Sequence, residues 1–301
     1  MRRPIAALVV VLAALGALSG CAVHAEPGRG VSVTGDVAYG PSGGMTLDVC
    51  APAAAAASTG PSGATRQPGR AAILSIHGGG WRGGDKRDAQ WRASCEWLAS
   101  EGFVVFQANY RLAPEHPFPA AIDDVRAVLR WMRDAEQVAE YGIDPARVGV
   151  FGDSAGGNLA ALLALEGDDA TDDSERVAAA VTISAPFDLT AQAPGEVGDG
   201  FDQVQFDYLG CTGYAQCPAA AAASPSSYVD PSDPPFYIVH ARSDALIPVE
   251  QAEAMRGALE AASIDTTLRV IPGDAHALSA LDDAMRREIA VWLTEKTAAG
   301  S

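Results

Sequence analysis

The sequence predicts an α/β fold: a mostly parallel, eight-stranded sheet with helices on both faces and a small cap insertion. Six short apolar runs rich in β-branched residues recur after residue 70, and stretches with helical periodicity separate most of them. The runs are apolar on both faces, which is typical of parallel strands buried between layers of helices. An alternating pair of segments at the start of the domain adds two further strands.

The first two strands are predicted for residues 31–39 and 45–49, where apolar and polar residues alternate around a Gly-Pro-Ser-Gly-Gly turn. Residues 51–70 are rich in Ala, Gly, Pro and Ser without periodicity, and we expect a flexible surface loop there. The six runs that follow are predicted as the remaining strands: residues 73–76, 103–106, 148–151, 181–183, 236–239 and 268–271.

Helices are predicted between these runs. In the stretch after Pro119, apolar residues recur at intervals of three and four: Ile122, Val125, Leu129 and Met132. A second helix, built of small residues, is predicted from Asn158 to Leu165. Residues 187–230 break the alternation and are rich in Gly, Pro and Ala, so we expect a cap-like insertion within a single domain of residues 31–298.

Composition and charge narrow the class of protein. The chain has 301 residues, of which 48% are hydrophobic and 20% charged, and this balance excludes a wholly disordered chain. Asp and Glu number 38 against 21 Lys and Arg, which gives a formal net charge of −17. An acidic surface repels phosphate backbones, so we expect no nucleic-acid partner.

The N-terminal segment has the pattern of a targeting signal, so we expect it to lie outside the folded domain. Residues 1–20 have a basic start, an apolar run and small residues before Cys21, the pattern of a lipoprotein signal peptide. We expect lipidation at Cys21, a tether over residues 21–30, and a lipid-anchored protein that faces the extracytoplasmic side of the membrane. An ordinary signal peptide or a single membrane anchor, with no role for Cys21, is the alternative.

Four more cysteines remain: Cys50, Cys95, Cys211 and Cys217. In an exported protein an even number suggests two disulfides, and three pairings are possible. The short separation of Cys211 and Cys217 favours a local loop, which leaves Cys50 to pair with Cys95. Metal binding is the weaker interpretation, because the chain has no CxxC and no closely spaced Cys/His set.

A candidate nucleophile lies between a predicted strand and a predicted helix. Residues 152–156 read Gly-Asp-Ser-Ala-Gly, a G-x-S-x-G element with Ser154 at its centre. Small neighbours allow a sharp strand-to-helix turn that lifts the Ser154 hydroxyl into a site at the helix N-terminus. The alternative is a glycine-rich turn with a bystander serine.

A glycine run after the strand at residues 73–76 favours the catalytic interpretation. Residues 77–81 read His-Gly-Gly-Gly-Trp, and such a run can turn backbone N–H groups toward a substrate oxygen. We predict an oxyanion hole from the N–H groups of Gly78, Gly79 and Ala155. A phosphate-binding loop is the rival, but no Lys-Ser/Thr or GxGxxG spacing accompanies the glycines.

A serine nucleophile needs a base, and the base needs an acid to orient it. Of the five histidines, His276 lies just beyond the last predicted strand, where a loop can reach over Ser154. Asp244 follows the preceding strand and is the predicted acid, whereas Asp274 is more consistent with a loop cap. The chain order Ser154, Asp244, His276 is that of hydrolases with a nucleophile on a strand-to-helix turn.

Taken together, these motifs resemble those of the α/β-hydrolase fold. They are most similar to bacterial hormone-sensitive-lipase-like esterases and their feruloyl-esterase-type (BD-FAE-like) and kynurenine-formamidase-type relatives. The matching segments are residues 77–81, 109–124 and 152–158 and the pair Asp244 and His276. The resemblance spans about residues 31–298. It implies a serine carboxylic ester hydrolase that uses no metal or organic cofactor and acts on a small-molecule ester.

The expected pocket is open, because no long helical cap precedes the first parallel strand. We predict that Trp81, Phe118, Phe187 and the insertion at residues 187–230 shape it, which favours short-chain acyl or aryl esters over long triglycerides. Two other functions remain open from sequence: an arylformamidase-type amidase, and a lipoprotein that uses the fold as a binding module without turnover.

Overall fold

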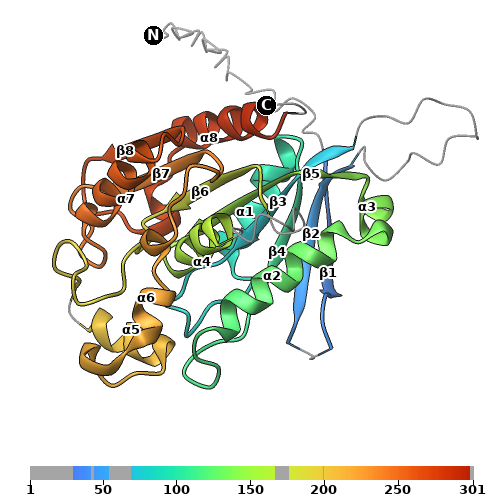
Figure 1. The fold of residues 1–301 in the computed structure, drawn as a ribbon. Helices are drawn as coiled ribbons and strands as arrows, with labels where there is room; N and C mark the ends of the chain where they lie inside the picture. Colours follow the sequence, from blue (N-terminus) through green and yellow to red (C-terminus); the bar gives the residue numbers. More distant parts are fainter. Residues whose placement is uncertain (1–29, 42–43, 54–68, 167–175, 199, 299–301) are drawn as a thin grey trace, which may run out of the picture.

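The computed structural model describes residues 30–41, 44–53, 69–166, 176–198 and 200–298 (Figure 1). The predicted signal peptide, Cys21 and most of the loop expected at residues 51–70 lie outside the described residues. No helix in the described part of the chain combines the length and the apolar character needed to cross a membrane.

The centre of the fold is one eight-stranded sheet with the strand order β1-β2-β4-β3-β5-β6-β7-β8. The strands are β1 (Val31–Ala38), β2 (Thr46–Pro52), β3 (Arg70–Ile76), β4 (Val104–Ala108), β5 (Ile143–Asp153), β6 (Ala179–Ile183), β7 (Phe236–Ala241) and β8 (Thr266–Ile271). Strand β2 pairs antiparallel with both β1 and β4, and every other pairing is parallel. The predicted mostly parallel, eight-stranded sheet is therefore confirmed.

Helices cover both faces of this sheet (Figure 1). Helices α2, α4 and α7 contribute to one hydrophobic core, and α1 and α8 contribute to a second core on the opposite face. The helices are α1 (Ala89–Ser100), α2 (Ala120–Arg133), α3 (Ala135–Tyr141), α4 (Ala155–Leu165), α5 (Phe201–Leu209), α6 (Pro218–Ala222), α7 (Val249–Ala261) and α8 (Asp283–Lys296).

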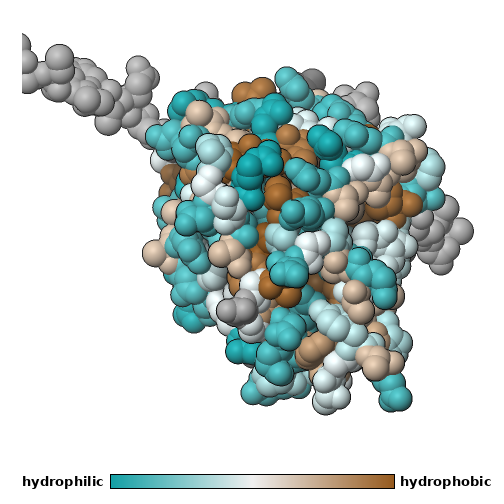
Figure 2. Space-filling model, turned by 90° about the vertical axis from the view of Figure 1, so that its left-hand side faces the viewer, coloured by the Kyte–Doolittle hydropathy of each residue, from teal (hydrophilic) through white to brown (hydrophobic). Residues whose placement is uncertain are grey.

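The amphipathic stripe predicted after Pro119 lies on α2, and its four apolar residues are all buried. Figure 2 shows hydrophilic side chains spread over one face of the molecule, with apolar residues visible between them. Among the described residues, the exposed large hydrophobic side chains are Val33 and Val291. Burial of the remaining apolar side chains on both faces is the main force that stabilises the sheet and its helices.

Both predicted disulfides are present in the structure. Cys50 of β2 is bonded to Cys95 of α1, and Cys211 is bonded to Cys217 between α5 and α6. The first bond connects the antiparallel edge of the sheet to a covering helix. The second bond closes a local loop in the insertion that follows β6.

We expect the double substitution Cys50→Ala/Cys95→Ala to lower the free energy of unfolding by about 4 kcal/mol in the loop-entropy picture. The physical reason is that this bond joins residues 45 apart in sequence and constrains the unfolded chain. The matched variant Cys211→Ala/Cys217→Ala releases a separation of only 6 residues, for which the same picture gives about 2 kcal/mol. Urea unfolding of both variants measures the difference, and equal losses would contradict the expectation.

Candidate active site

Ser154 occupies a strained turn at the junction of β5 and α4. Its backbone has φ 51° and ψ −121°, a conformation that a residue with a side chain seldom adopts. Flanking glycines make the turn possible, because a Cβ on Gly152 would lie 2.2 Å from the Gly156 carbonyl oxygen. A Cβ on Gly156 would lie 2.2 Å from the Ile76 carbonyl oxygen of β3. The G-x-S-x-G spacing thus lets the turn pack closely on itself and on the sheet.

The structure brings the three predicted catalytic residues together. The Nε2 atom of His276 is 3.0 Å from the Ser154 hydroxyl oxygen, and its Nδ1 atom is 2.7 Å from the Asp244 carboxylate. The two loops that carry the acid and the histidine follow β7 and β8, whose carboxyl ends lie at the same edge of the sheet as that of β5. Asp274, the alternative acid, is exposed to solvent.

Asp244 is held in its charged form by its hydrogen-bond partners. Burial by itself raises the pKa of Asp244, but bonds from His276 and from the Leu246 and Ile247 amides outweigh burial and hold the pKa below its usual value. The two amides donate to Oδ1 at 3.0 and 3.1 Å, which leaves Oδ2 for the imidazole. A carboxylate acceptor favours the proton on Nδ1 of His276, so Nε2 is free to accept the serine proton.

The predicted oxyanion hole needs one correction. The N–H group of Gly78 donates to the Asp153 carboxylate at 3.2 Å, so it cannot serve a substrate. Gly79 and Gly80 instead line the cavity beside Ser154, and their N–H groups have no hydrogen-bond partner within the described residues. Both glycines have positive φ angles, 111° and 61°. The available donors are therefore Gly79, Gly80 and Ala155, which begins α4, where the first amides lack partners within the helix.

A cluster of buried side chains, which the sequence did not predict, packs against the start of the glycine run at residues 77–81. The indole N–H of Trp91, on α1, donates to Asp153 Oδ1 at 2.8 Å, beside the bond from Gly78. The imidazole of His77 packs between the rings of Trp91 and Tyr110, at centroid distances of 5.1 and 4.4 Å. The Tyr110 hydroxyl donates to the His77 carbonyl at 2.9 Å. These contacts fix the start of the glycine run against the residue that precedes the nucleophile.

Two titratable groups in this buried cluster, Asp153 and His77, have shifted pKa values. Burial raises the pKa of Asp153 to about 7, against the opposing hydrogen bonds from Trp91 and Gly78. Burial also lowers the pKa of His77, which keeps that imidazole neutral. The only signal for Asp153 in the sequence is its position just before Ser154, and nothing in the sequence indicates that Trp91 reaches it.

Because its pKa differs between the folded and unfolded states, Asp153 should make the stability of the protein depend on pH. Its folded-state pKa of about 7 lies above its ordinary value of 3.8, so the folded state binds the extra proton between those pH values. The stability of the wild type should therefore fall as pH rises from about 4 to 7, while Asp153→Asn keeps the acceptor oxygen and loses this dependence. We therefore expect the Tm of the variant minus the Tm of the wild type to be larger at pH 8 than at pH 4.5 by about 3 °C or more. Parallel curves of Tm against pH for the two proteins would contradict this assignment.

A cavity of about 740 Å³ opens over Ser154 and His276. One part of its wall is polar and comprises Arg82, Gln90, Asp153 and Ser279. Another part is apolar and comprises Phe201, Val204 and Leu246. The wall can thus contact both apolar and polar parts of a small molecule.

The prediction that Trp81, Phe118 and Phe187 shape the pocket is wrong, since none of the three lines this cavity. Trp81 is fully buried and stacks on the ring of Tyr208 at a centroid distance of 4.3 Å. Phe118 packs against the edge of the same ring. Phe187 is buried, and its N–H group donates to the side chain of Gln251 at 2.9 Å. These aromatic residues support the wall from behind.

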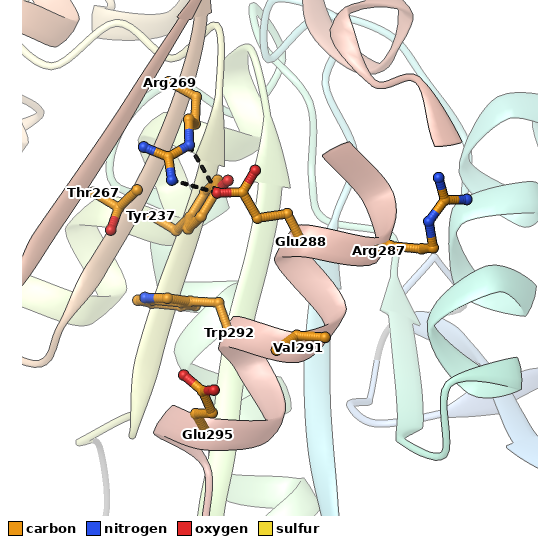
Figure 3. Close-up of a pocket in the computed structure, with 8 residues that line it drawn as sticks. All are labelled: Tyr237, Thr267, Arg269, Arg287, Glu288, Val291, Trp292 and Glu295. Atoms are coloured by element: carbon orange, nitrogen blue, oxygen red, sulfur yellow. Dashed lines mark hydrogen bonds and ion pairs between the residues drawn. The ribbon is translucent and has the colours of Figure 1, made fainter. Parts of the chain in front are cut away.

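A second hollow, of about 390 Å³, lies between β8 and α8 (Figure 3). Tyr237 and Trp292 line it, and the ion pair between Arg269 and Glu288 lies beside them. It contains no serine, cysteine or histidine that could act as a nucleophile or base. This hollow therefore lacks the serine and histidine pair that the cavity over Ser154 contains.

Comparison with known proteins agrees with this geometry. The family model BD-FAE matches residues 61–259, which is well over half of the chain. The chain belongs to the BD-FAE family. Esterase LipQ of Mycobacterium tuberculosis is 30% identical over 274 residues, which is 87% of this chain and 61% of LipQ. Carboxylesterase NlhH of the same species is 49% identical over 94 residues, 31% of this chain and 28% of NlhH. Bovine arylacetamide deacetylase is 44% identical over 96 residues, 32% of this chain and 24% of the deacetylase.

This BD-FAE chain thus spans between 24% and 61% of the length of these curated relatives. Among solved structures, a truncated carbohydrate esterase from gut microbiota superposes with a TM-score of 0.71 at 23% identity, covering 90% of this chain and 98% of that one. Esterase 2 of Thermogutta terrifontis, phosphonylated by sarin, has a TM-score of 0.66 at 25% identity, covering 89% and 94%. With the strand order, these likenesses confirm the predicted α/β-hydrolase fold.

Proposed function

We propose that the protein is a serine carboxylesterase that hydrolyses short-chain acyl or aryl esters through an acyl-enzyme. The observation that carries the proposal is the imidazole of His276, which lies 3.0 Å from the Ser154 hydroxyl and 2.7 Å from the Asp244 carboxylate. This chain of contacts ends beside glycine amides that can receive an oxyanion. The esterases among the relatives add support.

The cycle follows from these contacts. Ser154 attacks the ester carbonyl while Nε2 of His276 takes its proton, and Asp244 stabilises the resulting imidazolium. The amides of Gly79, Gly80 and Ala155 receive the negative oxygen of the tetrahedral intermediate. His276 then protonates the departing alcohol, and in the second half of the cycle it takes a proton from the water that attacks the acyl-enzyme.

The test combines a covalent probe with a substrate panel. A fluorophosphonate should label the purified domain at Ser154, as found by peptide mass spectrometry, and the protein should hydrolyse p-nitrophenyl acetate and butyrate. An unlabelled, inactive protein would indicate a binding module instead. Faster turnover of N-formylkynurenine than of phenyl acetate would indicate an amidase.

We also propose that the chain is exported and lipid-anchored at Cys21. The pattern of residues 1–21 supports this, and the two disulfides favour an oxidising compartment. Labelled palmitate fed to the producing bacterium should enter the wild-type protein but not Cys21→Ser. Incorporation into both proteins, or into neither, would overturn the anchor at this cysteine.

A further inference from the structure

Helix α5 lies directly against the glycine loop that follows β3. A Cβ on Gly80 would lie only 2.8 Å from Cγ1 of Val204, so the helix and the loop are in close contact at this point. The next loop residue, Trp81, packs against Phe201 at a centroid distance of 6.1 Å. Phe201 and Val204 are three residues apart, and both face the cavity over Ser154.

The rest of the same helix face is fixed to the loop. The ring of Tyr208 stacks on Trp81 with an angle of only 3° between their planes, and both side chains are fully buried. Arg82 forms an ion pair with Asp207 at 2.7 Å. The disulfide between Cys211 and Cys217 closes a short loop just after the helix. Contacts from successive loop residues therefore hold α5 as a fixed wall of the cavity.

The geometry of the reaction assigns a part of the ester to this wall. In the tetrahedral intermediate the oxyanion points to Gly79 and Gly80, and the leaving oxygen must lie near Nε2 of His276. Of the cavity walls that remain for the acyl chain, one presents the carboxyl group of Asp153 and another presents the apolar pair on α5. The carboxyl group of Asp153 is buried and hydrogen-bonded to Trp91 and Gly78, and a hydrocarbon chain packed against it would surround this polar group with apolar atoms, which is unfavourable. The apolar wall is the better acyl site.

We propose that Val204 is the residue that limits the length of the acyl chain. This specificity role rests on the proposed esterase function. Val204 closes the gap between α5 and Gly80, and the buried pair of Trp81 and Tyr208 behind it prevents the wall from receding. Short acyl chains fit in front of Val204, and longer chains collide with it.

The experiment compares acyl series on one leaving group. For p-nitrophenyl esters from acetate to octanoate, Val204→Ala should raise kcat/KM for hexanoate relative to butyrate by about tenfold over the wild-type ratio. Val204→Phe should lower the ratio of butyrate to acetate. The control Asp202→Asn changes an exposed residue in the first turn of the same helix and should keep the wild-type profile. Labelling by a fluorophosphonate shows that each variant retains a folded site.

A second series keeps the acyl group constant and varies the alcohol of acetate esters. Val204→Ala should leave this series unchanged, whereas a shift in the alcohol series alone would place α5 at the leaving group and overturn the proposal. Unchanged acyl profiles in both Val204 variants would also overturn it. Failure of the esterase function itself looks different, because the wild type would then neither turn over any ester nor react with the fluorophosphonate.

Discussion

Replacing Ser154 with alanine should abolish ester hydrolysis, lowering kcat by about 10⁴-fold or more. The variant lacks the only oxygen that lies within hydrogen-bonding distance of His276 Nε2 in the described structure. Alanine keeps the Cβ of the turn and adds no atom, so Tm should stay within about 2 °C of the wild type. Initial rates on p-nitrophenyl acetate and a thermal melt measure both quantities.

Ser184 provides the matched control. It is also buried, has a positive φ of 49°, and its hydroxyl accepts the Ala277 N–H at 3.0 Å in the loop that carries His276. Ser184→Ala removes a bond that positions this loop, so we expect a loss of no more than about tenfold. Wild-type activity in Ser154→Ala would end the assignment of the nucleophile.

Replacing Asp244 with asparagine should lower kcat by about 10³–10⁴-fold. The asparagine side chain keeps the shape of the acid but can present an NH₂ group to Nδ1 of His276, which then favours the proton on Nε2. An imidazole with its proton on Nε2 cannot accept the proton of Ser154. Because Asp244 also accepts two backbone amides, part of the variant population can keep its oxygen toward Leu246 and Ile247 and remain folded.

Asp274→Asn is the control for the acid, since Asp274 lies two residues from His276 but is exposed. Its kcat should stay within about twofold of the wild type, because surface substitutions away from a network have small effects. If Asp274→Asn rather than Asp244→Asn caused the large loss, the roles of the two residues would have to be exchanged.

Features set by local patterns could be predicted from the sequence. The six apolar runs, the stripe on α2 and the small residues around Ser154 each depend on neighbours within a few positions, and the structure has strands and helices at these places. The meeting of Ser154, Asp244 and His276 follows from strand order, because loops after parallel strands share one edge of a sheet. The pairing of Cys50 with Cys95 could be predicted because the short separation of Cys211 and Cys217 favours a bond between those two.

Features set by contacts between distant segments could not be predicted. The sequence shows three equivalent glycines, but Asp153 occupies the N–H of Gly78 and shifts the oxyanion donors onward by one residue. Trp81 looks like a pocket residue beside the glycines, yet α5 covers it and Tyr208 stacks on it. In each case the deciding neighbour is more than 70 residues away in the chain, where periodicity and spacing carry no information.

The order of the strands also determines how late in folding Ser154 and His276 can come together. Ser154 and His276 are 122 residues apart, and β8, which precedes the histidine, can dock only on β7, which in turn docks on β6. The chain up to α4 carries the nucleophile, but its hydroxyl has no base until β8 and the loop after it are in place. A chain that ends before His276 therefore lacks the imidazole that contacts Ser154, and the arrangement of the three residues is complete only at a late step.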